Sequence, residues 1–172
     1  SEKEKQKIET KVSDAFAHLN EELNINNEKG RLRTLSFDCI YGTDANPRMA
    51  RTAKMNMIMH GDGHGGVHHH DGLLNVNGIF ENRFDIILTN PPFGARVDKD
   101  LKISEADKFT DEIKIEEYKK RYGDENYERA LRQVNDNIGK SLLSLYKIDN
   151  GLTEVLFIER CLNLLKPGGR MG

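Results

Sequence analysis

Phe84-Asp-Ile-Ile-Leu-Thr-Asn-Pro-Pro-Phe93 is the stretch of the 172-residue sequence that decides the fold. Residues 84–89 predict a buried β-strand, because five of these six residues are apolar or β-branched. Pro91 and Pro92 have no backbone N–H to donate, so strand pairing must end before them. We therefore expect Asn90-Pro91-Pro92-Phe93 to form a loop at the carboxyl end of a strand. Open α/β sheets bind their ligands at that edge.

Two more strands that end in acidic residues are expected before this loop. Residues 37–41 form a short apolar run that leads into Gly42-Thr43-Asp44, and residues 67–70 form a second short strand that ends at Asp71. Between them, Asn46-Pro47 predicts a helix that begins with a side-chain cap followed by proline, and Gly61 predicts its end. The residues of this helix expected to face inward are Met49, Ala50, Ala53, Met57 and Ile58. Alternating strands and helices favour an α/β fold.

Helical periodicity is also present at both ends of the chain. Residues 4–23 have an apolar stripe made of Ile8, Val12, Ala15, Phe16 and Leu19. Residues 152–165 predict an amphipathic helix with Val155, Ile158, Leu162 and Leu165 on one face. Lys166-Pro167-Gly168-Gly169 is a stop signal for that helix, and in α/β proteins such a stop usually leads into another strand. The long polar segment between, residues 95–150, should contain helices of its own, at 112–121 and 126–134.

Composition describes a soluble globular chain with one expected domain. The hydrophobic fraction is 37%, and there is no long apolar run, signal peptide or transit peptide. Cys39 and Cys161 lie far apart in apolar surroundings, which favours reduced, packed thiols and a cytoplasmic location. The net charge of −2 gives no overall attraction to phosphate. Contact with nucleic acid would therefore need a local basic patch or a partner subunit.

The order of these elements resembles that of Rossmann-like S-adenosylmethionine-dependent methyltransferases. The loop resembles the Asn/Asp/Ser-Pro-Pro-Tyr/Phe/Trp motif of amino-group DNA methyltransferases. Four segments are similar to the modification subunits of type I restriction systems: Tyr41-Gly-Thr-Asp-Ala-Asn-Pro-Arg48, Ala53-Lys-Met-Asn-Met57, His60-Gly-Asp-Gly63 and Ile87-Leu-Thr-Asn-Pro-Pro-Phe-Gly94. The close resemblance covers residues 37–94 and 152–169. It implies a Rossmann-like α/β fold and transfer of a methyl group to the N6 amine of adenine in DNA.

The resemblance assigns catalysis to Asn90, Pro91, Pro92 and Phe93. The side-chain oxygen of Asn90 and the carbonyl of Pro91 would accept hydrogen bonds from the two amine protons of the target adenine. This would localise the nitrogen lone pair and direct it at the sulfonium methyl group. Phe93 would stack on the adenine after it has flipped out of the duplex. The alternative is a rigid turn that carries a buried phenylalanine.

The resemblance also implies residues that bind S-adenosylmethionine. Asp44 would accept hydrogen bonds from the ribose hydroxyls, Ala45 and Asn46 would flank the adenine, and Asp71 would contact the adenine amine. Each polar residue has an alternative local role. Asp44 is also a turn-forming residue, Asn46 a helix cap, and Asp71 a turn or helix cap.

Two further groups of residues have less specific meaning. The histidines His60, His64, His68, His69 and His70 are close in sequence, but a glycine-rich loop without a nearby cysteine does not fix tetrahedral geometry, so no metal is expected. The basic residues Arg96, Lys99, Lys119, Lys120, Arg121, Arg129 and Arg132 follow the catalytic motif and would contact phosphate. Acidic residues are interleaved with them, and a solvated face explains them equally well.

Part of the family pattern is not found in this sequence. The glycine-rich first motif after the central strand is missing, and so are the strands expected after Gly169. We therefore expect residues 1–172 to form a partial catalytic domain. Its parts would be an N-terminal helical segment (1–36), the cofactor and catalytic strands (37–94), a polar helical insertion (95–150), and a helix and turn (151–172). Alone, this chain is expected to bind S-adenosylmethionine weakly and to methylate nothing, and unpaired strand edges would favour homo-oligomers.

The intact protein would have macromolecular partners. The resemblance implies double-stranded DNA with a flipped adenine as substrate, and specificity and restriction subunits as partner chains, with no membrane. The rival within the same chemistry is a protein-glutamine or RNA methyltransferase, since these also use Asn-Pro-Pro followed by an aromatic residue. The rival from another class is a binding module without catalytic activity.

Overall fold

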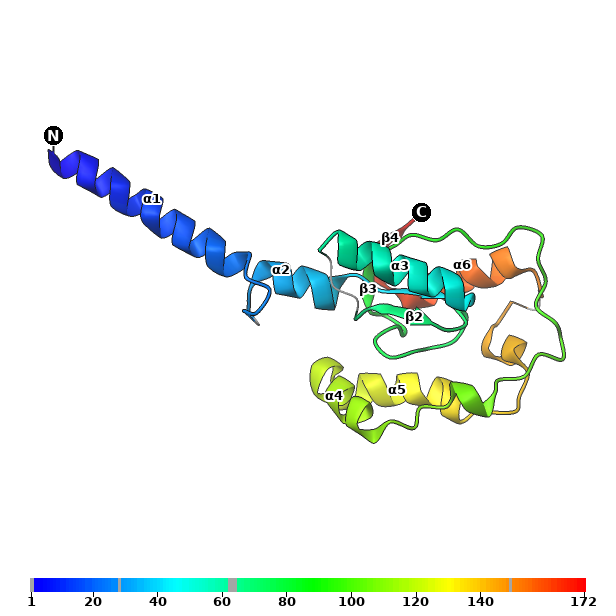
Figure 1. Ribbon diagram of the computed structural model, residues 1–172. Helices are drawn as coiled ribbons and strands as arrows, with labels where there is room; N and C mark the ends of the chain where they lie inside the picture. Colours follow the sequence, from blue (N-terminus) through cyan, green and yellow to red (C-terminus); the bar gives the residue numbers. More distant parts are fainter. Residues whose placement is uncertain (1, 28, 62–64, 149) are drawn as a thin grey trace. The chain divides into compact units, whose positions relative to one another are not determined.

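A computed structural model describes residues 2–27, 29–61, 65–148 and 150–172 of the chain. The fold is mixed α/β, with helices and short parallel strands (Figure 1). The chain divides into two compact units, Ser1–His69 and His70–Gly172. Each unit contains a two-stranded parallel sheet: β1 pairs with β2 in the first, and β3 pairs with β4 in the second.

In the first unit, helix α3 (Pro47–Met59) packs on β1 (Gly42–Asp44) and β2 (Val67–His69). The Asn46 side chain caps the helix by accepting hydrogen bonds from two backbone N–H groups of the first turn, at 2.9 and 3.4 Å. At the other end, Gly61 takes a left-handed conformation with φ of +73°. The predicted start and end of this helix are therefore confirmed, and β2 agrees with its prediction to within one residue.

The burial of α3 differs from the prediction. Ala50 is buried, whereas Met49, Ala53 and Ile58 are exposed. A sheet of two three-residue strands covers only part of a 13-residue helix. Most of the apolar face of α3 is therefore open in this unit.

Close packing requires a glycine at position 66. The backbone N–H of Gly42 donates to the carbonyl of Gly66 over 3.0 Å, where the parallel strands begin. A Cβ atom at Gly66 would lie 2.0 Å from the carbonyl oxygen of Ile40. Glycine therefore lets the two chain segments approach closely enough to start the β1–β2 pair.

The strand predicted at residues 37–41 is wrong. Helix α2 (Arg31–Thr34) continues into a π-helix at Leu35–Cys39, and the strand begins only at Gly42. The guanidinium of Arg33 lies 4.3 Å from the centre of the Phe37 ring, and the Ser36 hydroxyl donates to the carbonyl of Gly61 over 3.2 Å. A helix that has already formed extends at low cost, and a short apolar run fits a helix as well as a strand.

The predicted N-terminal helix is confirmed as α1 (Glu2–Glu22). None of its residues is buried, and the stripe that includes Ile8, Phe16 and Leu19 is exposed.

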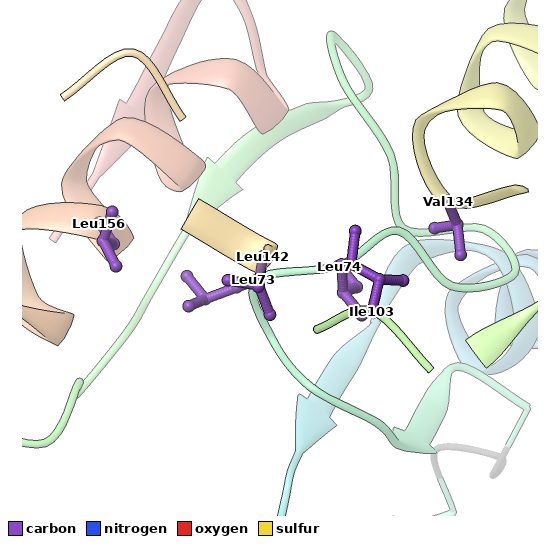
Figure 2. Close-up of a cluster of buried hydrophobic side chains, with 6 residues drawn as sticks. All are labelled: Leu73, Leu74, Ile103, Val134, Leu142 and Leu156. Atoms are coloured by element: carbon purple, nitrogen blue, oxygen red, sulfur yellow. The ribbon is translucent and has the colours of Figure 1, made fainter. Parts of the chain in front are cut away.

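The second unit is built around a core to which the polar segment contributes. Its buried cluster consists of Leu73, Leu74, Ile103, Val134, Leu142 and Leu156 (Figure 2). Three of these six come from residues 95–150: Ile103, Val134 and Leu142. Phe80, Tyr127 and Ala130 form a second cluster, in which the Phe80 and Tyr127 rings meet edge-on at 6.0 Å. The segment expected as a polar insertion is thus part of the core of this unit.

The helices predicted within this segment are confirmed. Helix α4 spans Glu112–Tyr122 and helix α5 spans Asp124–Asn135. Two short 3-10 helices, Glu105–Asp107 and Leu142–Leu145, occupy the rest of the segment together with loops. Asp111 caps α4 by accepting from the backbone N–H of Lys114 over 3.1 Å.

Helix α6 and the β3–β4 strand pair differ from the predictions in three respects. Helix α6 spans Thr153–Leu164, close to the predicted range, but its buried face contains Leu156, Arg160 and Leu164, while the predicted apolar positions Ile158 and Leu162 are exposed. The residues predicted as a stop signal and turn, 166–169, lie instead within strand β4 (Leu165–Met171). This strand pairs in parallel with β3 (Phe84–Ile87). β3 is not a buried strand, since Ile86 is 64% exposed. The register shifts between Phe84, which pairs with Leu165, and Ile86, which pairs with Arg170, so residues 166–169 form an irregular, bulge-like part of β4.

Candidate functional site

The Asn90–Phe93 loop follows β3 as predicted and is exposed to solvent. Asn90, Pro92 and Phe93 are exposed, with Phe93 at 82%. Phe93 is therefore not the buried turn residue of the alternative interpretation. Just before the loop, the backbone N–H of Thr89 donates to the carbonyl of Gly172 over 3.1 Å, which continues the β3–β4 pairing. The loop thus starts from a fixed point and presents its functional groups outward.

The chain after the loop is held by the start of α6. The carbonyl of Ala95 accepts two hydrogen bonds from Thr153, one from its backbone N–H and one from its hydroxyl, both at 3.0 Å. The backbone N–H of Val97 donates to the carbonyl of Gly151 over 2.8 Å. The Asn90–Phe93 loop is therefore anchored on both sides by residues of the same C-terminal segment.

The turn that contains Asp71 is held by another part of α6. Arg160, only 2% exposed, donates from Nε to the carbonyl of Gly72 over 3.1 Å and from Nη2 to the carbonyl of Leu74 over 2.8 Å. Its Nη1 donates to the side-chain oxygen of Asn75 over 2.8 Å. Arg160 and Thr153 are about two helical turns apart, roughly 10 Å along the axis. Helix α6 therefore holds both the Asp71 turn and the chain that follows the Asn90 loop.

A tyrosine adds to this support. The hydroxyl of Tyr146 donates to the carbonyl of Leu73 over 2.5 Å. Burial raises the pKa of Tyr146, so its hydroxyl remains a protonated donor at neutral pH.

Asp71 itself makes a local turn and retains acceptor capacity. Its Oδ1 accepts from the backbone N–H of Leu73 over 2.9 Å, as the capping alternative predicts. Within the described residues, its Oδ2 has no hydrogen-bond partner. This oxygen can accept a hydrogen bond from a ligand amine.

The other proposed cofactor residues lie together in the first unit. Asp44 is the last residue of β1, and its Oδ1 accepts from the backbone N–H of Asn46 over 2.7 Å. The carbonyl of Ala45 lies 3.1 Å from Nε2 of His69, and Asn46 caps α3. The local roles considered for Asp44 and Asn46 are therefore both present. Oδ2 of Asp44 has no hydrogen-bond partner in the described part of the chain and can still accept from a ribose hydroxyl.

The histidines that the structure describes do not form a metal site. Nδ1 of His70 lies 3.2 Å from the carbonyl of Asp71, and its Nε2 lies 3.7 Å from Oδ1 of Asp107. Among the residues that the structure describes, no group of three or more His, Cys, Asp or Glu side chains could hold a metal ion. His64 lies outside the described residues.

Several of the predicted basic residues form ion pairs with acidic neighbours. Lys119 lies 3.1 Å from Glu128, whose pKa its ammonium lowers, and Arg132 lies 3.4 Å from the same carboxylate. Lys120 lies 3.6 Å from Glu116. These pairs are what a solvated, charge-balanced face would contain.

Of the two free cysteines, Cys161 is buried as expected, but Cys39 is exposed.

The residues that support the loop, Thr153, Arg160 and Tyr146, are not indicated by the sequence patterns. The apolar face predicted for α6 excludes Arg160. A buried arginine has no signature in a periodic pattern, because its burial depends on acceptors that the fold brings to it. The turn residues Asn150-Gly151 before α6 mark a helix start, but they do not reveal which carbonyl Thr153 contacts.

None of the described helices combines the length and apolar character needed to cross a lipid bilayer.

Comparison with known proteins gives the family. No curated protein and no solved structure matches the chain. The N-6 DNA Methylase family matches residues 19–123, a range that includes β1, β2, β3 and the Asn90–Phe93 loop and is more than half of the 172 residues. The chain therefore belongs to the N-6 DNA methylase family.

Proposed function

We propose that the protein is a site-specific DNA methyltransferase that transfers a methyl group from S-adenosylmethionine to the N6 amine of adenine, within a restriction-modification system. Family membership supports N6 methylation of DNA. The observation that carries the proposal is the exposed Asn90–Phe93 loop, which is anchored before Asn90 by Gly172, just after β4, and after Phe93 by α6. Such a loop offers hydrogen-bond acceptors and an aromatic ring at fixed positions.

The proposed chemistry follows from the hydrogen bonds that the loop can accept from the adenine amine. S-adenosylmethionine, when bound, supplies a methyl group on a positively charged sulfur. Asn90 Oδ1 and the Pro91 carbonyl accept hydrogen bonds from the two protons of the adenine amine and direct its lone pair at the methyl carbon. Methyl transfer would form the nitrogen–carbon bond as the carbon–sulfur bond breaks, and one amine proton would be released to solvent. The products are N6-methyladenine and S-adenosylhomocysteine.

The two prolines and Phe93 have separate roles in the proposed site. Pro91 and Pro92 restrict the backbone, which keeps the two acceptors in place before the substrate arrives. Phe93 offers an exposed ring on which a flipped adenine can stack. The loop therefore needs little rearrangement to engage a base.

The acidic residues fit the proposed cofactor. The ribose hydroxyls and the adenine amine of S-adenosylmethionine are hydrogen-bond donors, and Asp44 and Asp71 each have a carboxylate oxygen that no other described residue contacts. Ala45 and Asn46 would flank the adenine. A Rossmann-like arrangement of these strands is part of the same proposal.

The partners follow from charge and chemistry. With a net charge of −2, the chain has no general affinity for DNA phosphates, so contact with double-stranded DNA would depend on a local patch or a partner subunit. Specificity and restriction subunits would be those partner chains. The open edges of the two-stranded sheets would favour association with further chains, including homo-oligomers. We propose a cytoplasmic location, where substrate DNA would be accessible.

Product analysis tests the proposal directly. DNA is incubated with the full-length protein and S-adenosylmethionine, digested to nucleosides and separated by mass-spectrometric chromatography. We expect N6-methyladenine, and none in a reaction without protein. Methylcytosine alone, or no methylated nucleoside at all, would refute the assignment.

Replacing Phe93 with alanine should impair methyl transfer much more than cofactor binding. Base stacking on an aromatic side chain is worth about 1–3 kcal/mol, which corresponds to roughly a 5- to 150-fold loss of activity. Titration calorimetry with S-adenosylmethionine and turnover on DNA separate the two effects. Ile113→Ala, which removes another exposed apolar side chain, is the control and should change neither. Loss of cofactor affinity with normal turnover would contradict the assigned role of Phe93.

A further inference from the structure

The residues immediately after the catalytic loop are held by the first two residues of α6. Thr153 is buried, and both its backbone N–H and its hydroxyl donate to the carbonyl of Ala95, two residues beyond Phe93. A carbonyl that accepts two hydrogen bonds at 3.0 Å has both of its lone pairs engaged. Thr153 therefore fixes the position of Ala95 more firmly than a single contact would.

Glu154 contacts the residue between Phe93 and Ala95. The backbone N–H of Gly94 donates to its Oε1 over 3.4 Å, a long hydrogen bond. Gly94 has φ of +70°, in the left-handed region, so the chain turns sharply at this residue. A group that holds Gly94 in place therefore affects the orientation of Phe93, the residue before it.

The other oxygen of Glu154 is buried and has no hydrogen-bond partner among the described residues. A buried carboxylate oxygen without a partner is a cost to the folded state, so it requires an explanation other than stability. The contact that Glu154 does make, to the Gly94 N–H, supplies the explanation.

We propose that Thr153 and Glu154 are positioning residues that hold Gly94 and Ala95, and thereby set the orientation of Phe93 and Asn90 for methyl transfer. The inference rests on the proposed function, because it assigns these two side chains to the same catalytic loop. Neither residue contacts the base itself. Their effect depends on geometry, and a displacement of about 1 Å at a reacting group can cost on the order of a hundredfold in rate.

A competing explanation for Glu154 is a purely structural one. An acidic residue in the first turn of a helix also stabilises that helix through the helix dipole. The two explanations make opposite predictions for two conservative variants. Glu154→Gln keeps the length and the acceptor for Gly94 but removes the charge, whereas Glu154→Asp keeps the charge but is one methylene too short to reach.

The experiment measures kcat and KM of the full-length protein on DNA, together with hydrogen–deuterium exchange of the peptide that contains residues 90–97. We expect Glu154→Asp to lower kcat about 10- to 100-fold with KM for S-adenosylmethionine nearly unchanged, and to speed exchange in that peptide. Glu154→Gln should keep most of the activity and the slow exchange. Thr153→Val, which removes only the hydroxyl bond, should behave like Glu154→Asp, and Thr153→Ser should restore it.

Glu117→Gln is the matched control, because Glu117 is an exposed glutamate on α4. It should leave kcat and exchange at residues 90–97 unchanged. The inference is overturned if Glu154→Asp is fully active while Glu154→Gln is impaired, or if Thr153→Val and Glu154→Asp leave both kcat and exchange unaltered. Failure of the proposed function would show differently, as the absence of N6-methyladenine in reactions of the unsubstituted protein.

Discussion

Replacing Asn90 with alanine is expected to lower the turnover of adenine methylation on the order of a hundred- to a thousandfold, by analogy with the removal of one oriented polar group from a transition-state site. The reason is that the amide oxygen would be one of only two acceptors for the amine protons. Without it, the nitrogen lone pair stays delocalised into the purine ring. The affinity for S-adenosylmethionine should stay within a factor of about three, because Asn90 would contact only the base.

Two variants make this result specific. Asn90→Asp keeps an acceptor oxygen at the same distance from the backbone and should retain measurable turnover, since aspartate occurs at this position of the motif that the loop resembles. Asn163→Ala, which removes an exposed asparagine side chain from α6, is a control for the loss of an asparagine and should not affect turnover. Asn90 is exposed, so its substitution should not alter the fold. Turnover of Asn90→Ala close to that of the unsubstituted protein would remove Asn90 from the mechanism.

Replacing Arg160 with methionine should lower the free energy of unfolding by about 3–5 kcal/mol, the range for removal of one member of a buried charged network. Methionine fills similar space but donates no hydrogen bond. The carbonyls of Gly72 and Leu74 would lose their buried donor, and Glu81, 3.4 Å from the guanidinium, would lose its opposite charge. Urea denaturation followed by circular dichroism measures the change as a shift of the midpoint.

Arg129→Met is the matched control for this substitution. Arg129 is exposed on α5, so its replacement should change the free energy of unfolding by less than about 0.5 kcal/mol. Arg160→Lys should lie between the two, because an ammonium group keeps the charge but cannot donate in three fixed directions. Equal urea midpoints for Arg160→Met and Arg129→Met would show that the network around Arg160 contributes little.

Local sequence signals determined where most helices begin and end. Asn46-Pro47 and Gly61 bound α3, and helical periodicity located α1 and α6. These signals act between residues a few positions apart: a cap accepts from the next turn, and a glycine ends the helix it follows. For the same reason the sequence located the Asn90–Phe93 loop, since two prolines end strand pairing wherever they occur.

Only the tertiary structure decided which surfaces are buried. The sequence predicted an apolar face on α6, yet that helix buries Arg160, because the 72–75 segment brings two carbonyls and an amide oxygen to its guanidinium. The apolar run at 37–41 became helix and not strand through its continuity with α2 and the contact between Ser36 and Gly61. The hold of Thr153 on Ala95 joins residues 58 positions apart. No local pattern encodes such contacts, because burial of a polar group is stable only when distant parts of the chain supply its hydrogen-bond partners.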